Sequence, residues 1–113
     1  MNIGIEKRRH LRIPLWWPVV LMPPQGPIMG VTRNISVGGT LIFCSEAIET
    51  GDKFQIILKS SGDHEIPITC EKVRSEKIVA GNSEYNAIGL LFTKMSSSIQ
   101  NFIASMVEEY SLV

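Results

Sequence analysis

Residues 28–44 read IMGVTRNISVGGTLIFC, two apolar runs with serine and glycine between them. From Ile28 to Ile35 apolar residues mix with small and polar ones, as in a strand. Residues 36–39, Ser-Val-Gly-Gly, interrupt this run, because serine and glycine favour turns. A second short apolar run follows from Thr40 to Cys44. The stretch therefore predicts two strands with a turn between them.

Short apolar runs bounded by turn residues also fill most of the remaining chain. Pro14 and Pro18 interrupt the run from Ile13 to Met22, so we expect an edge strand or an irregular first strand there. Further strands are predicted at residues 54–58, 66–73 and 85–92, with a hairpin loop at residues 60–63 in which Gly62 supplies a positive φ. Six or seven such strands are typical of a barrel or sandwich rather than an α/β fold.

A helix is predicted near the C-terminus. Apolar residues recur there with helical spacing, and polar residues cover the opposite face. Ser97 and Gln100 have the spacing of a capping box. We expect the apolar stripe to pack on the strands, with a partner-binding helix as the alternative. The stripe consists of Ile99, Phe102, Ile103, Met106, Val107 and Tyr110.

Charge is distributed unevenly along a chain whose formal net charge is zero. The 113 residues suffice for one domain, and 44% hydrophobic with 19% charged residues is an ordinary globular balance. The first 40 residues carry five basic side chains against one acidic, whereas the remaining 73 carry six against ten. A focused cationic patch on a neutral protein suits a compact anion better than a long polyanion such as a nucleic acid.

The sequence also predicts a cytoplasmic location. No window approaches 18 consecutive apolar residues, so no membrane span is expected, and the first dozen residues lack the apolar core of a signal peptide. Cys44 and Cys70 lie inside apolar runs, where buried free thiols are the expected state. A disulfide between them is the alternative.

Four basic side chains cluster at Lys7, Arg8, Arg9 and Arg12. A guanidinium group binds phosphate oxygens with its planar fork, stacks its flat face on a base and pairs with the O6 and N7 edge of guanine. Arg8 and Arg12 are four residues apart, which in an irregular arm can bring both groups onto one ligand. Taken alone, however, such a cluster near a terminus is more often a solvated surface than a binding site.

The second candidate motif is the stretch from Asn34 to Gly39. Asn34 and Ser36, two apart on a strand, point to the same face and offer short polar groups to a ligand. Gly38 and Gly39 allow the chain to bend and a ligand to approach the backbone closely. The alternative is a bulge stabilised by the asparagine or serine side chain, with no ligand.

Taken together, Arg8-x-x-x-Arg12 and Asn34-x-Ser36-x-x-Gly39 resemble the two motifs of the PilZ domain family, which are bacterial receptors for cyclic di-GMP. The resemblance also includes residues 6–13, residues 38–42, Gly51, and residues 87–92 with the helix that follows. It therefore extends over about residues 6–110.

This resemblance implies a mainly β fold, a six-stranded antiparallel β-barrel with a C-terminal amphipathic helix. A single domain is expected at residues 6–113, after a flexible N-terminus at residues 1–5. Within it, the resemblance implies a basic ligand-binding arm at residues 6–12, a barrel at residues 13–93 and a helix at residues 97–111.

The ligand implied is cyclic di-GMP, and no metal or other cofactor is expected. Arg8 and Arg12 would hold its phosphates and guanine bases, while Asn34 and Ser36 would project from the barrel surface and take the remaining hydrogen bonds. Gly39 would keep that surface open. Lys7, Arg9 and Gly38 flank these residues and complete the expected site.

Some residues depart from the family's pattern or lie outside its motifs. Asn34 replaces the commoner aspartate, and Thr40 stands where an apolar residue is more frequent. Trp16 and Trp17 are expected in the core, with a role as a stacking platform as the alternative. Arg74, on a late strand, is a further candidate for stacking on a base.

No catalytic set is visible in the sequence, so we expect a receptor and not an enzyme. The signal would pass to a separate, unidentified protein partner. Lys7 and the three neighbouring arginines could neutralise four phosphate charges, which predicts two cyclic di-GMP molecules per chain. The alternatives are a PilZ-type protein–protein adaptor in motility or pilus control, and a barrel that binds single-stranded nucleic acid.

Overall fold

The computed structural model describes residues 11–48, 53–60, 62 and 64–111. The expected flexible N-terminus and most of the basic arm lie outside these residues. The elements are β1 (Ile13–Pro14), β2 (Pro18–Met22), β3 (Ile28–Ile35), β4 (Gly39–Cys44), β5 (Lys53–Ser60), β6 (His64–Ala80), β7 (Ser83–Lys94) and α2 (Ser97–Ser111).

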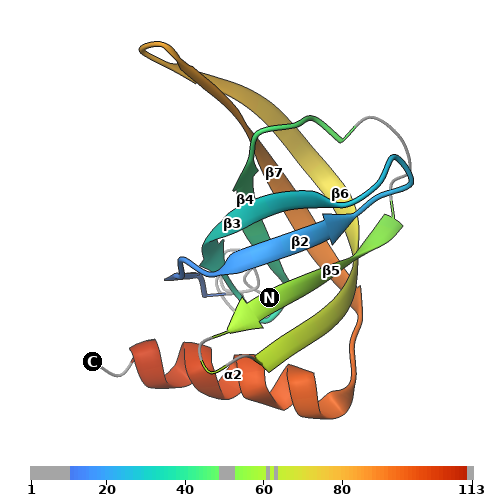
Figure 1. The fold of residues 1–113 in the computed structure, drawn as a ribbon. Coiled ribbons are helices and arrows are strands. Elements are labelled where there is room, and N and C mark those ends of the chain that lie inside the picture. The colour runs from blue at the N-terminus through green and yellow to red at the C-terminus, as the bar shows by residue number, and fades with distance from the viewer. Residues whose placement is uncertain (1–10, 49–52, 61, 63, 112–113) are drawn as a thin grey trace, which may run out of the picture.

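Among the described residues, six antiparallel strands close into a barrel. The order is β3-β2-β5-β6-β7-β4, and β4 pairs back onto β3, which completes the ring (Figure 1). The two-residue β1 pairs only with the end of β3, beside β2. The predicted six-stranded antiparallel barrel is therefore confirmed.

The first strand is split into β1 and β2, as the two prolines predict. Thr32 of β3 joins the two pieces, because its Oγ1 accepts a hydrogen bond from Trp17 N (2.8 Å) and donates one to Leu15 O (2.6 Å). β2 is not an edge strand, since it pairs with both β3 and β5. The hydroxyl group of a buried threonine thus bonds to the backbone where the prolines interrupt the strand.

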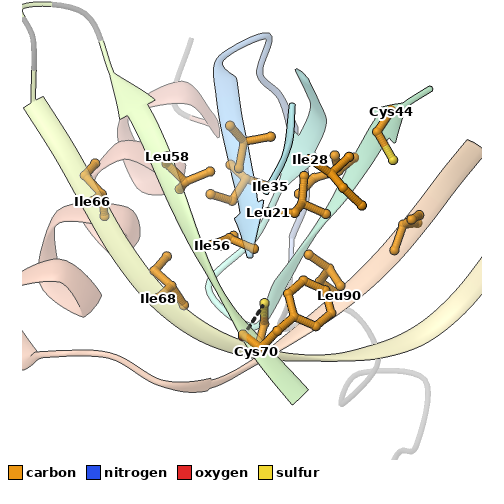
Figure 2. Close-up of a cluster of buried hydrophobic side chains, with 14 of the residues drawn as sticks. Leu21, Ile28, Ile35, Cys44, Ile56, Leu58, Ile66, Ile68, Cys70 and Leu90 are labelled. Atoms are coloured by element: carbon orange, nitrogen blue, oxygen red, sulfur yellow. Dashed lines mark hydrogen bonds between the residues drawn. The ribbon is translucent and has the colours of Figure 1, made fainter. Parts of the chain in front are cut away.

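Alternating side chains of the strands fill the interior of the barrel, as Figure 2 shows. Leu21, Ile56, Leu58 and Ile68 are almost completely buried, in keeping with the period of two along each strand. Cys70 is buried and free, and burial raises the pKa of its thiol to about 12. Cys44 is also buried and free, so the prediction of two free thiols is confirmed.

Helix α2 covers one end of the barrel (Figure 1). Ile103 and Val107 are buried against the core, and the Phe102 ring stacks on Trp17 with 6.4 Å between centroids. The predicted capping box at Ser97 is wrong, because Ser96 is the cap and its Oγ accepts the backbone N–H of Ile99 (3.2 Å). No helix in the described part of the chain is long and apolar enough to cross a membrane.

The β6–β7 hairpin extends well beyond the barrel and projects from it in Figure 1. Pairing of β5 with β6 ends at Glu71, and pairing of β4 with β7 ends at Asn86, so the outer residues pair only with each other. Gly81, at φ 63°, forms the turn between the two strands. The sequence predicted this turn but made both strands shorter than they are.

Candidate ligand-binding site

A β-bulge on β3 orients the asparagine of the second motif. The β3–β4 register shifts between Thr32, which is opposite Ile42, and Asn34, which is opposite Leu41. Thr32 is buried, whereas Arg33 is exposed and Asn34 half-buried, so two consecutive side chains are accessible from outside. The extra residue reverses the inward and outward alternation at this point, as β-bulges do. Asn34 therefore reaches the surface of the barrel.

Arg12 meets Asn34 at this bulge. The pairing of Ile13 with Ile35 brings the end of the arm beside β3. Arg12 Nη1 then donates a hydrogen bond of 2.7 Å to Asn34 Oδ1. The backbone of Asn34 is held from the other side, since Thr40 Oγ1 donates to Asn34 O (2.7 Å). The structure thus brings together one residue of each predicted motif, Arg12 and Asn34. Thr40, which departs from the family's pattern, supports this contact through its hydrogen bond.

Two hollows adjoin this contact, and both are lined by Arg12, Asn34 and Leu41. The first, of about 220 Å³, is here called the β7-side hollow, and the second, of about 360 Å³, the β1-side hollow. The β7-side hollow is completed by Thr40, Val73, Arg74, Gly89 and Leu90. The β1-side hollow is completed by Ile13, Pro14, Arg33 and Phe43.

Arg74 enters the β7-side hollow from a second bulge. The register of β6 with β7 shifts between Lys72 and Arg74, which leaves Val73 as an extra, exposed residue. Arg74 is paired with Gly89, where a Cβ atom would lie 3.3 Å from the Cβ of Arg74. Glycine at this position therefore leaves room beside the arginine.

The site carries positive charge that the described residues do not neutralise. Within the described ranges, Arg12, Arg33 and Arg74 have no ion-pair partner. Partial burial lowers the pKa of Arg12, and the positive charge of Arg74 lowers it further. The guanidinium group stays protonated at neutral pH, so the two cations repel each other across the hollow. An anion between them would relieve this repulsion.

Ser36 does not project from the barrel, and this part of the prediction is wrong. Its side chain is buried, and its Oγ accepts the backbone N–H groups of Gly38 (3.1 Å) and Gly39 (3.2 Å). β3 ends at Ile35, so the alternation that placed Ser36 beside Asn34 does not continue into the turn. Ser36 closes the turn that the alternative interpretation described.

Gly39 serves the packing of β4 against β7. A Cβ atom at this position would lie 2.2 Å from Leu90 O, which no side chain can satisfy without moving a strand. The neighbouring Gly38 O accepts the backbone N–H of Phe92 (2.8 Å). The glycine pair therefore lets two strands approach each other, where the sequence suggested an approach by the ligand.

The two tryptophans separate into different roles. Trp17 is half-buried and stacks on Phe102, so the expected core position holds for it in part. Trp16 is 56% exposed, and the Arg33 guanidinium lies 4.4 Å from its ring centroid. The expected core position is wrong for Trp16, because it belongs to the irregular segment between β1 and β2.

Part of the predicted site cannot be placed, and part of the observed site was not predicted. Lys7, Arg8 and Arg9 lie outside the described residues. The sequence motifs did not indicate Arg33, whose position depends on the bulge, or the apolar wall residues. These wall residues are Leu41, Phe43 and Val73. In the described part of the chain, no three His, Cys, Asp or Glu side chains lie close enough together to hold a metal ion.

Known protein families and solved structures include relatives of this chain. The model of the PilZ domain matches residues 6–109. The PilZ domain of YcgR from Escherichia coli, solved with cyclic di-GMP, has a TM-score of 0.71 at 13% identity, covering 91% of this chain and 90% of that domain. No curated protein sequence matches the chain.

Two longer proteins share the fold. The Klebsiella pneumoniae MrkH complex with cyclic di-GMP gives a TM-score of 0.78 at 18% identity, covering 93% of this chain and 52% of MrkH. The Bacillus subtilis inhibitor of motility MotI gives 0.74 at 16% identity, covering 93% of this chain and 51% of MotI. The chain thus spans about half the length of these two proteins.

Proposed function

The chain belongs to the PilZ domain family, and we propose that it is a receptor for cyclic di-GMP that relays the signal to a partner protein. The observation that carries this proposal is the Arg12–Asn34 contact between two hollows, each of which holds a further arginine. Solved complexes of YcgR and MrkH with cyclic di-GMP, both similar in fold, support the choice of ligand.

The chemistry of the ligand matches the unneutralised arginines. Cyclic di-GMP carries two phosphate charges and two flat guanine bases. Guanidinium groups bind phosphate with two parallel hydrogen bonds and stack on bases, so Arg12 and Arg74 supply both kinds of contact. Asn34 offers an amide to a guanine edge. The basic arm with Lys7, Arg8 and Arg9 would add charge from the other side, as its composition suggests.

The remaining residues of the second motif would act by positioning. Ser36 and the glycine pair hold the turn after β3, and the turn fixes where β3 and β4 meet. We therefore assign Ser36, Gly38 and Gly39 to the support of Asn34, with direct ligand contacts coming from the arginines and the asparagine. No catalytic step is proposed, because the site is a set of cations and amides suited to binding.

Calorimetric titration with cyclic di-GMP tests this function. Each charge-assisted contact contributes about 1.5–3 kcal/mol, so Arg12→Ala should weaken binding at least tenfold. Lys53→Ala is the matched control, because it removes one positive charge from an exposed position outside both hollows. Equal affinities of the wild type and Arg12→Ala would remove Arg12 from the site.

Ligand binding should also stabilise the fold. At a hundredfold excess over the dissociation constant, linkage gives about 2.7 kcal/mol, which corresponds to roughly 10 °C in melting temperature. A melting curve that responds to an oligonucleotide but not to cyclic di-GMP would favour the nucleic-acid alternative instead.

We propose two ligands per chain, on the basis of the basic arm. Two stacked ligands bring four negative charges together, and Lys7 with the three arginines of the arm supplies four positive charges. The calorimetric endpoint of the wild type should be two, and Lys7→Leu should lower it towards one. An endpoint of one for the wild type would contradict this stoichiometry.

The proposed setting is the bacterial cytoplasm, with a separate protein as the receiver of the signal. The free thiols of Cys44 and Cys70 support a reducing compartment. We also propose the domain limits expected from the sequence, with an arm at residues 6–12 and a barrel from residue 13.

A further inference from the structure

The β1-side hollow is larger than the β7-side hollow, and most of its wall lies outside the two sequence motifs. Its volume of about 360 Å³ lies near the lower limit of small-molecule pockets, which is about 300 Å³. The β7-side hollow, at about 220 Å³, falls below that limit. The two hollows share Arg12, Asn34 and Leu41, so a ligand with two nucleotide halves can reach into both.

The walls of the β1-side hollow combine cations with apolar surface. Arg12 and Arg33 provide the charge, and Pro14, Leu41 and Phe43 provide the apolar area. Phe43 is supported from β7, since its ring lies 4.9 Å from that of Tyr85 between centroids. A phosphate alone would gain nothing from the apolar wall, whereas a nucleobase has a hydrophobic face and a polar edge.

Arg33 is held in place by the exposed Trp16. The guanidinium carbon lies 4.4 Å from the ring centroid, over the ring, in a cation–π contact. The backbones are tied as well, because Leu15 N donates to Arg33 O (3.2 Å). Arg33 lines the hollow, whereas Trp16 does not.

We propose that the β1-side hollow is a nucleobase subsite, in which Arg33, positioned by Trp16, stacks on one guanine base of the bound ligand. This inference rests on the proposed function and extends it. It assigns a binding role to Arg33 and a positioning role to Trp16, neither of which belongs to the two sequence motifs. The base would lie against Phe43 and Leu41, with its attached phosphate near Arg12.

Calorimetric titration of Arg33 variants with cyclic di-GMP tests the subsite. Removal of a base-stacking side chain typically weakens binding about tenfold, and we expect this for Arg33→Ala. Arg33→Lys keeps the charge but loses the flat surface, so it should regain little affinity. Lys53→Ala should bind like the wild type. Full recovery by Arg33→Lys would reduce the role of Arg33 to charge and overturn the stacking.

The positioning role of Trp16 has its own test in a double-mutant cycle. Trp16→Leu alone should weaken binding severalfold. In the Arg33→Ala background the same change should have no further effect, because Trp16 acts through Arg33. Additive losses would overturn the positioning role.

The two levels of the proposal fail in different ways. Normal binding by Arg33→Ala together with loss in Arg12→Ala would overturn the subsite and leave the receptor function intact. No binding of cyclic di-GMP by the wild type would overturn both.

Discussion

The helix end of the barrel and the arginine site differ in how completely their polar and charged groups find partners. At the helix end, Ile103 and Val107 are buried, Trp17 stacks on Phe102, and Ser96 caps the first turn of α2. At the arginine site, Arg12 and Arg74 have no acidic partner among the described residues. The helix end consists of contacts that stabilise the fold, whereas the arginine site keeps a positive charge that the described residues do not neutralise. The two regions are therefore expected to respond differently to substitution.

The largest effect on stability should come from the helix end. Ile103 is fully buried between α2 and the barrel, so Ile103→Ala should lower the free energy of unfolding by about 2–5 kcal/mol. Affinity for cyclic di-GMP, measured where the variant is still folded, should stay close to that of the wild type. Asn101→Ala, on the exposed face of the same helix, is the control for urea unfolding. A large loss of affinity in folded Ile103→Ala would show that the helix end and the arginine site are coupled.

Gly39→Ala should lower stability more than affinity, although Gly39 belongs to a predicted binding motif. The new Cβ would collide with Leu90 O, and overpacking of this kind costs about 1–3 kcal/mol. Gly89→Ala is the informative counterpart, since its Cβ would meet side chains and no backbone atom, Arg74 Cβ at 3.3 Å and Val73 Cγ2 at 4.0 Å. We expect the first variant to lose mainly stability and the second mainly affinity, in denaturation and calorimetry respectively. The reverse order would contradict the roles assigned to the two glycines.

Ser36→Ala should also lower stability more than affinity, by a smaller amount than Gly39→Ala. Removal of the hydroxyl leaves two backbone N–H groups without their acceptor, which should cost about 1–2 kcal/mol of stability. Affinity should fall less than in Arg12→Ala, because Ser36 is proposed to support Asn34 without touching the ligand. Chemical denaturation and calorimetry on the same sample give both values. A loss of affinity equal to that of Arg12→Ala, at unchanged stability, would place Ser36 in direct contact.

The smallest effect is a pH dependence that arises from a buried thiol inside the barrel. Burial raises the pKa of Cys70 to about 12, so the folded state keeps the thiol protonated while the unfolded chain ionises above its ordinary pKa of about 8.5. The stabilising contribution is complete below that value and is lost as the pH rises towards 12. From pH 8 to 9.5 the free energy of unfolding should fall by about 1 kcal/mol. Cys70→Ala should show a correspondingly weaker alkaline dependence in urea titrations.

Much of the fold follows from local patterns that the sequence displays directly. The apolar stripe identifies α2, Gly62 supplies the expected positive φ of 84°, and the two prolines split the first strand. These three features depend on residue type and short-range geometry, and for that reason one sequence is enough to predict them. That Arg12 and Asn34 share one site was implied by the family resemblance, and the pairing of Ile13 with Ile35 brings them together although they are 22 residues apart.

What the sequence did not reveal depends on pairing between strands. The exposure of Arg33 follows from a bulge against β4, and that register is not visible in β3 alone. Ser36 was placed outside because the alternation was extended one residue beyond the end of the strand. The tight fit of Gly39 arises from β7, some fifty residues further along the chain. In each case the environment of the residue depends on where a strand ends or on which strand pairs with it, and the neighbouring sequence does not determine either.

The projecting β6–β7 hairpin runs without interruption from the wall of the β7-side hollow to a turn outside the barrel. The bulge at Val73 and the paired Arg74 and Gly89 line the hollow, and Ala80 lies six residues beyond Arg74, next to the turn. β4 holds β7 as far as Asn86, which is paired with Lys77, so only the three pairs beyond it extend free of the barrel. At about 3.3 Å per residue, this free part is roughly 10 Å long, and the turn lies roughly 20 Å along the strand from Arg74. The same pair of strands therefore carries the chain from the hollow to a surface that is separate from it.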